Sequence, residues 1–189
     1  MQKEDMDRYR NLNNDSDGRR TRSLAAAAAA TFKSFSGRSS TDILKIVRLL
    51  QNSDPEVRIS ALQSLAGIGG INNVPYVLQC LNDRDRHVRV MACRALSRMR
   101  AHTAKSKLYD SLNDRNAEVR CAAAVALSDM GDRAGLPTVT RLVCTSGAHQ
   151  MEALRAFSLI IKQKFPINQR GLKQAIRWIK LRRKHNIKF

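Results

Sequence analysis

The side chains best suited to metal binding or nucleophilic chemistry are four histidines and four cysteines: His87, His102, His149, His185, Cys80, Cys93, Cys121 and Cys144. No two histidines stand four residues apart, the spacing that puts two ligands on one helix face. The cysteines form no Cys-x-x-Cys pair, and a nucleophilic thiol also needs a neighbouring base. We therefore predict no catalytic residue, no cofactor and no metal site.

Basic side chains offer a different chemistry, the binding of anionic groups. Lys and Arg number 34 against 16 Asp and Glu, which gives a formal net charge of +18. Residues 148–189 carry eleven basic residues and one acidic residue, so more than half of the excess lies there. Such an asymmetry favours an anionic partner. We predict two groups of partner-binding residues: Arg84, Arg86, Arg94 and Arg98, and Lys173, Arg177, Lys180 and Lys184.

An internal repeat determines which elements carry these residues. An Asp/Asn-x-x-Val-Arg motif occurs three times at 31-residue intervals, with first and last residues Asp54 and Arg58, Asp85 and Arg89, and Asn116 and Arg120. The first residue is a predicted helix N-cap, and apolar residues follow at helical spacing. A shorter helix precedes each cap, so each unit is a helical hairpin that buries its apolar side only by stacking. We interpret the repeated Arg as a structural residue that hydrogen-bonds between neighbouring units.

The repeat predicts an all-α fold, an α-solenoid of about four 31-residue helical hairpins followed by a basic C-terminal helix. Residues 1–40 lack apolar periodicity and are predicted to be a disordered arm that contains the alanine run 25–30. Residues 41–165 form the repeat domain, with a second helix at 148–161 in the last unit. Residues 166–189 form the capping helix and tail, in which Leu172, Ile176 and Ile179 are the buried stripe, whereas Trp178 and Leu181 fall off it.

Within the repeat, alanines at positions 61, 92 and 123 and leucines at positions 65, 96 and 127 also recur every 31 residues. Together with the motif and the short period, these alanine and leucine columns resemble the HEAT-like repeats of phycobilisome lyases and their relatives, strongly over residues 41–132. The resemblance implies an α-solenoid and, by family name, a lyase activity. A relative with similar repeats, deoxyhypusine hydroxylase, binds iron through His-Glu pairs. Here no Glu follows any histidine, so that iron site is not expected: the following residues are Val88, Thr103, Gln150 and Asn186.

We therefore expect a non-catalytic adaptor that binds a protein partner, an acidic one, through the repeat surface and the basic groups. The alternative is binding of nucleic acid through its phosphate backbone. A phycobilin-lyase-like activity is the third interpretation, and membrane binding is disfavoured because the apolar stripe is used internally. One contiguous positive groove would indicate nucleic acid, and dispersed charge a protein. Unpaired cysteines favour a reducing compartment, the cytoplasm.

Overall fold

The structure, a computed structural model, describes residues 40–145, 147 and 149–185. Almost all of the predicted N-terminal arm, 1–40, lies outside this description, so its disorder stays a prediction. The described ranges contain no strand, which confirms the all-α prediction. Their helices are α3 (Ser40–Leu49), α4 (Pro55–Ile68), η1 (Ile71–Asn73), α5 (Val74–Gln79), η2 (Cys80–Asn82), α6 (Arg86–Arg98), η3 (His102–Ala104), α7 (Lys105–Ser111), α8 (Ala117–Asp129), α9 (Leu136–Cys144), α10 (Gln150–Ile161) and α11 (Gln169–Lys184).

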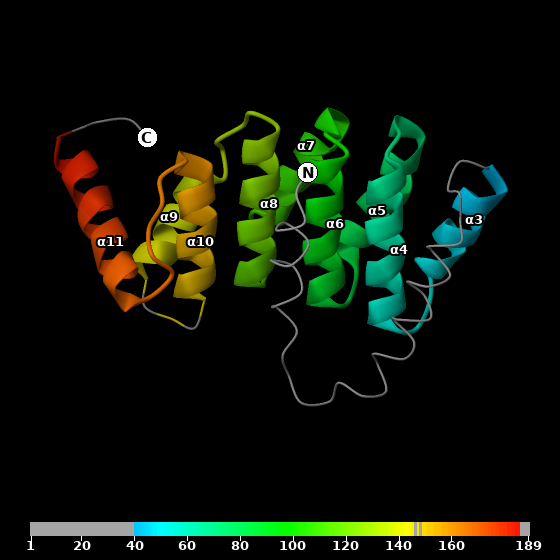
Figure 1. The fold of residues 1–189 in the computed structure, drawn as a ribbon, viewed down its shortest axis with the longest axis horizontal. Coiled ribbons are helices and arrows are strands. Elements are labelled where there is room, and N and C mark those ends of the chain that lie inside the picture. The colour runs from blue at the N-terminus through cyan, green and yellow to red at the C-terminus, as the bar shows by residue number, and fades with distance from the viewer. Residues whose placement is uncertain (1–39, 146, 148, 186–189) are drawn as a thin grey trace.

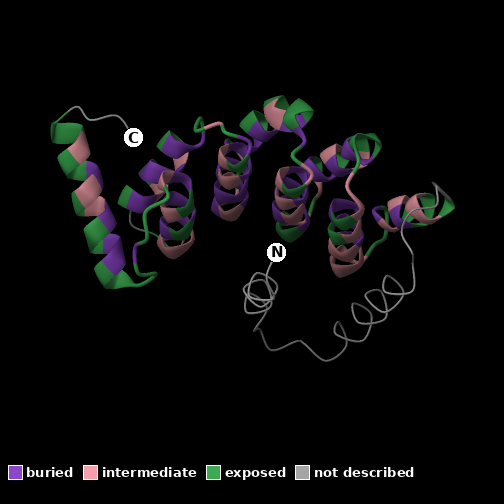
Figure 2. Cartoon of the chain, turned by 45° about the horizontal axis from the view of Figure 1, so that its top comes forward, coloured by how far each residue is buried: buried purple, intermediate pink, exposed green. Residues whose placement is uncertain are grey.

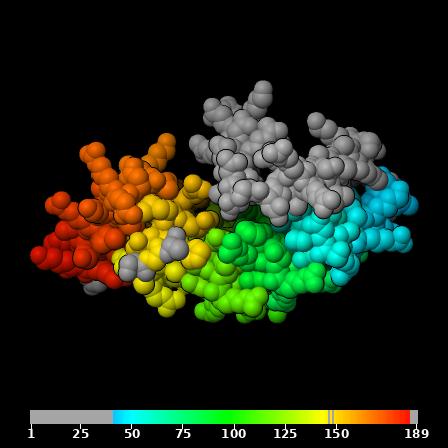
Figure 3. All heavy atoms as spheres, turned by 90° about the horizontal axis from the view of Figure 1, so that it is seen from below, coloured from blue at the N-terminus to red at the C-terminus, as the bar shows by residue number. Residues whose placement is uncertain are grey.

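The helices form four hairpins in a row, closed by α11 (Figure 1). Unit 1 is α3 and α4, unit 2 is α5 and α6, unit 3 is α7 and α8, and unit 4 is α9 and α10. The second helices stand side by side in one layer, with α5, α7 and α9 behind them. The row bends into an arch (Figure 2), and its atoms form one continuous curved body (Figure 3). This stacking confirms the predicted α-solenoid.

The repeat motif explains why the second helices begin and pack where they do. Asp54, Asp85 and Asn116 each accept a hydrogen bond from the backbone N–H two residues further on, at 2.9, 2.8 and 2.9 Å. These bonds satisfy amides that have no partner inside the helix. The alanine and leucine columns that follow are completely buried: Ala61, Ala92, Ala123, Leu65, Leu96 and Leu127. Unit 4 lacks an Asp or Asn cap, and α10 begins at Gln150 without a side-chain cap, two residues after the predicted position 148.

Helix α11 closes the array by packing on α9 and α10. Its N-cap Asn168 accepts a hydrogen bond from the Gly171 backbone N–H at 3.0 Å. Leu172 and Ile179 are buried, as the stripe requires, whereas Ile176 is half-buried at its margin. Among the residues described, none of the helices combines the length and the apolar character that crossing a bilayer requires.

An aromatic cluster anchors the docked side of α11. The Trp178 ring meets the Phe157 ring edge-on at 5.8 Å between centroids and the Phe165 ring at 6.4 Å. The guanidinium carbon of Arg182 lies 4.4 Å from the centroid of the Trp178 ring. Trp178 therefore widens the buried face, whereas Leu181 is 50% exposed.

Candidate interaction surfaces

A buried arginine connects unit 1 to unit 2. Arg58 is 4% exposed, and its Nε and Nη2 donate to Oδ2 and Oδ1 of Asp83 in the next unit, at 2.8 and 2.7 Å. Its Nη1 donates to the backbone carbonyls of Asn52 and Ser53 in its own unit, at 2.8 and 3.0 Å. Arg58 therefore bridges two units by charge-assisted hydrogen bonds, which are the stronger kind.

The same arrangement recurs one unit later. Arg89 donates Nε and Nη2 to the carboxylate of Asp114 at 2.8 and 3.0 Å, and Nη1 to the carbonyls of Asp83 and Arg84 at 2.8 and 3.3 Å. In unit 3, Nη1 of Arg120 keeps the two carbonyl contacts, at 2.7 and 3.2 Å. We call the bidentate Arg58–Asp83 and Arg89–Asp114 contacts the interunit ion pairs.

The acidic halves of these pairs were not singled out from the sequence. Burial by itself raises the pKa of Asp83 and Asp114, but hydrogen bonds from the paired arginine and from a backbone N–H outweigh it, so each pKa is lowered. The carboxylate comes from the following unit, not from the N-cap Asp54. The signal that could have identified it is a second column of the 31-residue period, 25 residues after each Arg.

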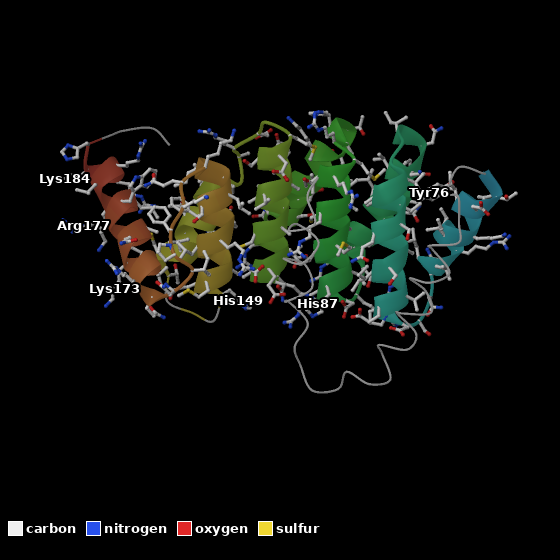
Figure 4. All side chains as sticks on the ribbon, viewed as in Figure 1. Tyr76, His87, His149, Lys173, Arg177 and Lys184 are labelled. Carbon is white, nitrogen blue, oxygen red and sulfur yellow. The ribbon has the colours of Figure 1, made fainter. Side chains whose placement is uncertain are left out.

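The four basic residues predicted on the last helix share the exposed side of α11, which we call the basic face: Lys173, Arg177, Lys180 and Lys184. Figure 4 labels three of them, and these project from the side of α11 that faces away from the array. Within the described residues none of the four takes part in an ion pair. Like charges three and four residues apart repel by about 0.2–0.5 kcal/mol per pair, which an anion would relieve.

Apolar surface lies among these cations. Half-buried Ile176 and exposed Leu181 line, together with the basic face, a shallow hollow of about 400 Å³. A second hollow shares Lys173 and Arg177 with the first and adds Arg170. The basic face therefore offers a binding segment both charge and apolar contact.

Two of the basic residues predicted near the middle of the chain, Arg84 and Arg86, are engaged within the array. Arg84 precedes α6, and its Nη2 donates to the Ser53 carbonyl of unit 1 at 3.0 Å. Arg86 begins α6, and its Nε lies 3.7 Å from Oε2 of Glu118 on α8. Both side chains therefore have partners in neighbouring units.

Arg94, which is half-buried, and Arg98, which is exposed, follow on α6. Carboxylates lie on the neighbouring helix α8, where Asp129 accepts a hydrogen bond from Ser97 of α6 at 2.5 Å. Basic and acidic side chains are thus interleaved between α6 and α8. The structure does not bring these arginines together with the basic face of α11, because unit 3 and unit 4 stand between them.

Comparison with known families identifies the architecture. Residues 43–128, from α3 into α8, match the family model for HEAT repeats. The stacked hairpins of this stretch are therefore similar to HEAT repeats. A comparison with curated proteins found no match to the chain. Unit 4 follows the matched stretch and packs on unit 3 through α8. The finer resemblance to phycobilisome lyases stays a prediction, because the matched description names HEAT repeats only.

Three of the four thiols are packed inside the helical array. Burial raises the pKa of Cys80 to about 11, and that of Cys93 and Cys121 to about 12. Such thiols are almost wholly protonated near neutral pH and are therefore weak nucleophiles. Cys144, at the end of α9, is exposed.

The histidines are placed at the ends of helices. Figure 4 shows His87 and His149 at the same end of α6 and α10. His149 Nδ1 lies 3.9 Å from a carboxylate oxygen of Glu118. Within the described ranges, no group of three or more His, Cys, Asp and Glu side chains could hold a metal ion.

Proposed function

We propose that this HEAT-repeat protein is a non-catalytic adaptor that binds an acidic segment of a partner protein on the basic face of α11. The observation that carries this proposal is the set of four exposed cations without an ion-pair partner among the described residues. HEAT repeats commonly mediate protein–protein interaction, and a curved helical array offers extended surfaces for it.

The hollow between the cations supports a segment with both acidic and apolar residues. A helix with carboxylates at spacings of three and four would match the basic residues, which have the same spacings. An apolar side chain of that helix could rest between Ile176 and Leu181. Charge would then guide the approach, while apolar burial would supply a central contact.

The firm docking of α11 also supports this proposal. Trp178 packs into the aromatic cluster, and Leu172 and Ile179 are buried. The basic side chains therefore project from a helix whose position is already set. Binding to a pre-organised surface avoids the entropy cost of ordering it.

Nucleic acid is the second candidate partner, supported by the net charge of +18. A phosphate backbone needs a continuous positive track. The basic face of α11 is separated from the arginines of α6, and these are interleaved with carboxylates such as Glu118 and Asp129. This distribution favours a protein partner. We place the adaptor in the cytoplasm, since all four cysteines are free.

Charge reversal on the full chain tests the basic face. The test variant changes Lys173, Arg177, Lys180 and Lys184 to Glu. The control variant makes the same change in net charge at four other exposed residues: Arg48, Lys107, Arg141 and Lys164. Affinity is measured for a synthetic helical peptide with Glu and Leu on one face, and for a single-stranded oligonucleotide, over a range of salt concentrations.

We expect the test variant to bind the peptide about 10- to 100-fold more weakly, and the control variant to retain most of its affinity. Circular dichroism melts should be similar, because exposed charges contribute little stability. Equal losses in both variants would show attraction by net charge alone and would contradict the proposal. Tighter, steeply salt-dependent binding of the oligonucleotide, lost in the test variant, would instead support the nucleic-acid alternative.

A further inference from the structure

The junction between units 3 and 4 lacks the acidic half of the interunit ion pair. In the earlier junctions an arginine binds a carboxylate 25 residues further on, as Arg89 binds Asp114. The same interval counted from Arg120 leads to Thr145, which has a hydroxyl where its counterparts have a carboxylate. The arginine of the ion pair is therefore present as Arg120, but a threonine stands in place of the aspartate.

Arg120 is held in the same way as the arginines of the complete junctions. Its Nη1 donates to the carbonyls of Asp114 and Arg115 at 2.7 and 3.2 Å, as Nη1 of Arg89 does to the matching carbonyls one unit earlier, at 2.8 and 3.3 Å. In the complete junction one unit earlier, the same anchor leaves the Nε and Nη2 edge of Arg89 to bind the carboxylate of the next unit. Within the described residues, no hydrogen bond from Nε or Nη2 of Arg120 is found.

Thr145 has the backbone position of the missing carboxylate. It is the C-cap of α9, with φ −96° and ψ 127°, and Asp83, the C-cap of η2, has φ −59° and ψ 146°. Both backbones are extended and lead from the first helix of a unit into its second helix. Thr145 is exposed, and its Oγ1 donates to the Arg141 carbonyl at 2.9 Å. The hydroxyl therefore lies at the surface, where another protein could reach it.

We propose that Thr145 is a phosphorylation site whose phosphate is bound by Arg120. Oγ1 of Thr145 attacks the γ-phosphorus of ATP held by a protein kinase. The bond from that phosphorus to the β,γ-bridging oxygen breaks, ADP leaves, and the hydroxyl proton passes to a base of the kinase. The product carries about −1.5 to −2 charges and three strong acceptor oxygens. Two of these oxygens match the Nε and Nη2 donors, as the two carboxylate oxygens do in the other junctions.

The local electrostatics include one opposing contribution. A negative group after the C-terminus of α9 is disfavoured by the helix dipole. Asp83 occupies the same place in unit 2, and there the hydrogen bonds from Arg58 and a backbone N–H still lower its pKa. At Thr145 the exposed Arg141, in the last turn of α9, adds a further favourable positive charge.

The ion pair between units is permanent in the two earlier junctions. Between units 3 and 4 it would form only when Thr145 is phosphorylated. Unit 4 supports α11, so an ion pair at this junction would fasten the helix that carries the basic face to the rest of the array. Its effect on partner binding rests on the proposed function, whereas the contact with Arg120 does not. If the charge-reversal experiment contradicted the proposed function, the proposed contact between Arg120 and phosphorylated Thr145 would still stand. If the phosphate did not bind Arg120, the proposed role of the basic face would likewise still stand.

The test compares full-length chains with phosphothreonine inserted at position 145 during translation, in the wild-type background and with Arg120→Gln. We expect the phosphate to raise Tm by about 2–6 °C, and the gain to disappear with Arg120→Gln. Phosphothreonine at the exposed Thr103, which lies in η3 of unit 3, is the matched control, and no gain that depends on Arg120 is expected there.

Thr145→Asp provides a second variant, because it restores the carboxylate of the complete junctions. We expect it also to raise Tm in a manner that depends on Arg120. A phosphate at Thr145 that leaves Tm unchanged, or a gain that persists in Arg120→Gln, overturns the proposal. Stabilisation by Thr145→Asp alone also overturns it, because the junction would then accept a carboxylate but not the longer phosphothreonine.

Discussion

Arg89 of unit 2 and Asp114 of unit 3 form a bidentate ion pair, with Nε 2.8 Å from Oδ2 and Nη2 3.0 Å from Oδ1. Arg89 is 5% exposed, so its charge is almost withdrawn from water and depends on this carboxylate. The same side chain also binds two carbonyls at the end of its own hairpin. One guanidinium thereby fixes how two consecutive hairpins meet.

Arg89→Gln should lower the free energy of unfolding by about 2–4 kcal/mol, because it leaves Asp114 without its partner and two carbonyls without a donor. Urea denaturation measures the loss. Arg98→Gln, at an exposed position of the same helix, is the control and should change stability by less than about 0.5 kcal/mol. Similar losses in both variants would show that the interunit ion pair does not stabilise the array.

Acid should weaken the array through the two interunit carboxylates. The pKa of Asp83 and that of Asp114 are lowered in the folded protein, where arginine hydrogen bonds outweigh the opposing effect of burial. Their stabilisation is therefore complete above the pKa of an unfolded Asp and is lost as pH falls through the lower folded value. We expect Tm to fall between about pH 5 and pH 3.

The double variant Asp83→Asn/Asp114→Asn should have a lower Tm at neutral pH and a shallower decline in acid. Thermal melts at a series of pH values measure both effects. Asp110→Asn, at an exposed carboxylate outside the interunit ion pairs, should keep the wild-type profile. An unchanged slope in the double variant would assign the acid sensitivity to other groups.

Gly171→Ala should disturb the docking of α11. A Cβ at this position would lie 1.8 Å from the carbonyl oxygen of Pro166, which is backbone and cannot rotate away. We expect a loss of about 1–3 kcal/mol and a red-shifted emission of Trp178, the single tryptophan of the chain, as its aromatic cluster opens. Gly67→Ala is the control, because a Cβ there meets no atom within 4 Å. Unaltered emission from Gly171→Ala would mean that the N-terminus of α11 can shift without undocking.

The sequence by itself determined the hairpins and their stacking period. A cap such as Asn116 acts on the backbone two residues away, and the column that contains Leu96 follows from 3.6 residues per turn. The common side of Lys173 and Arg177 on α11 follows from the same periodicity. These interactions are local, so they can be read along the chain, and the 31-residue recurrence implies that the hairpins stack alike.

Only the tertiary structure decided which residues meet across that stack. Arg58 binds Asp83 rather than its own cap Asp54, and Trp178, off the predicted stripe, completes an aromatic cluster. The tertiary structure also shows that Arg86 has an acidic neighbour, Glu118, whereas the exposed cations of α11 lie elsewhere on the array. Such pairings depend on the angle and offset between neighbouring hairpins. Those are set by the summed packing of many buried side chains, a quantity that no single motif or spacing contains.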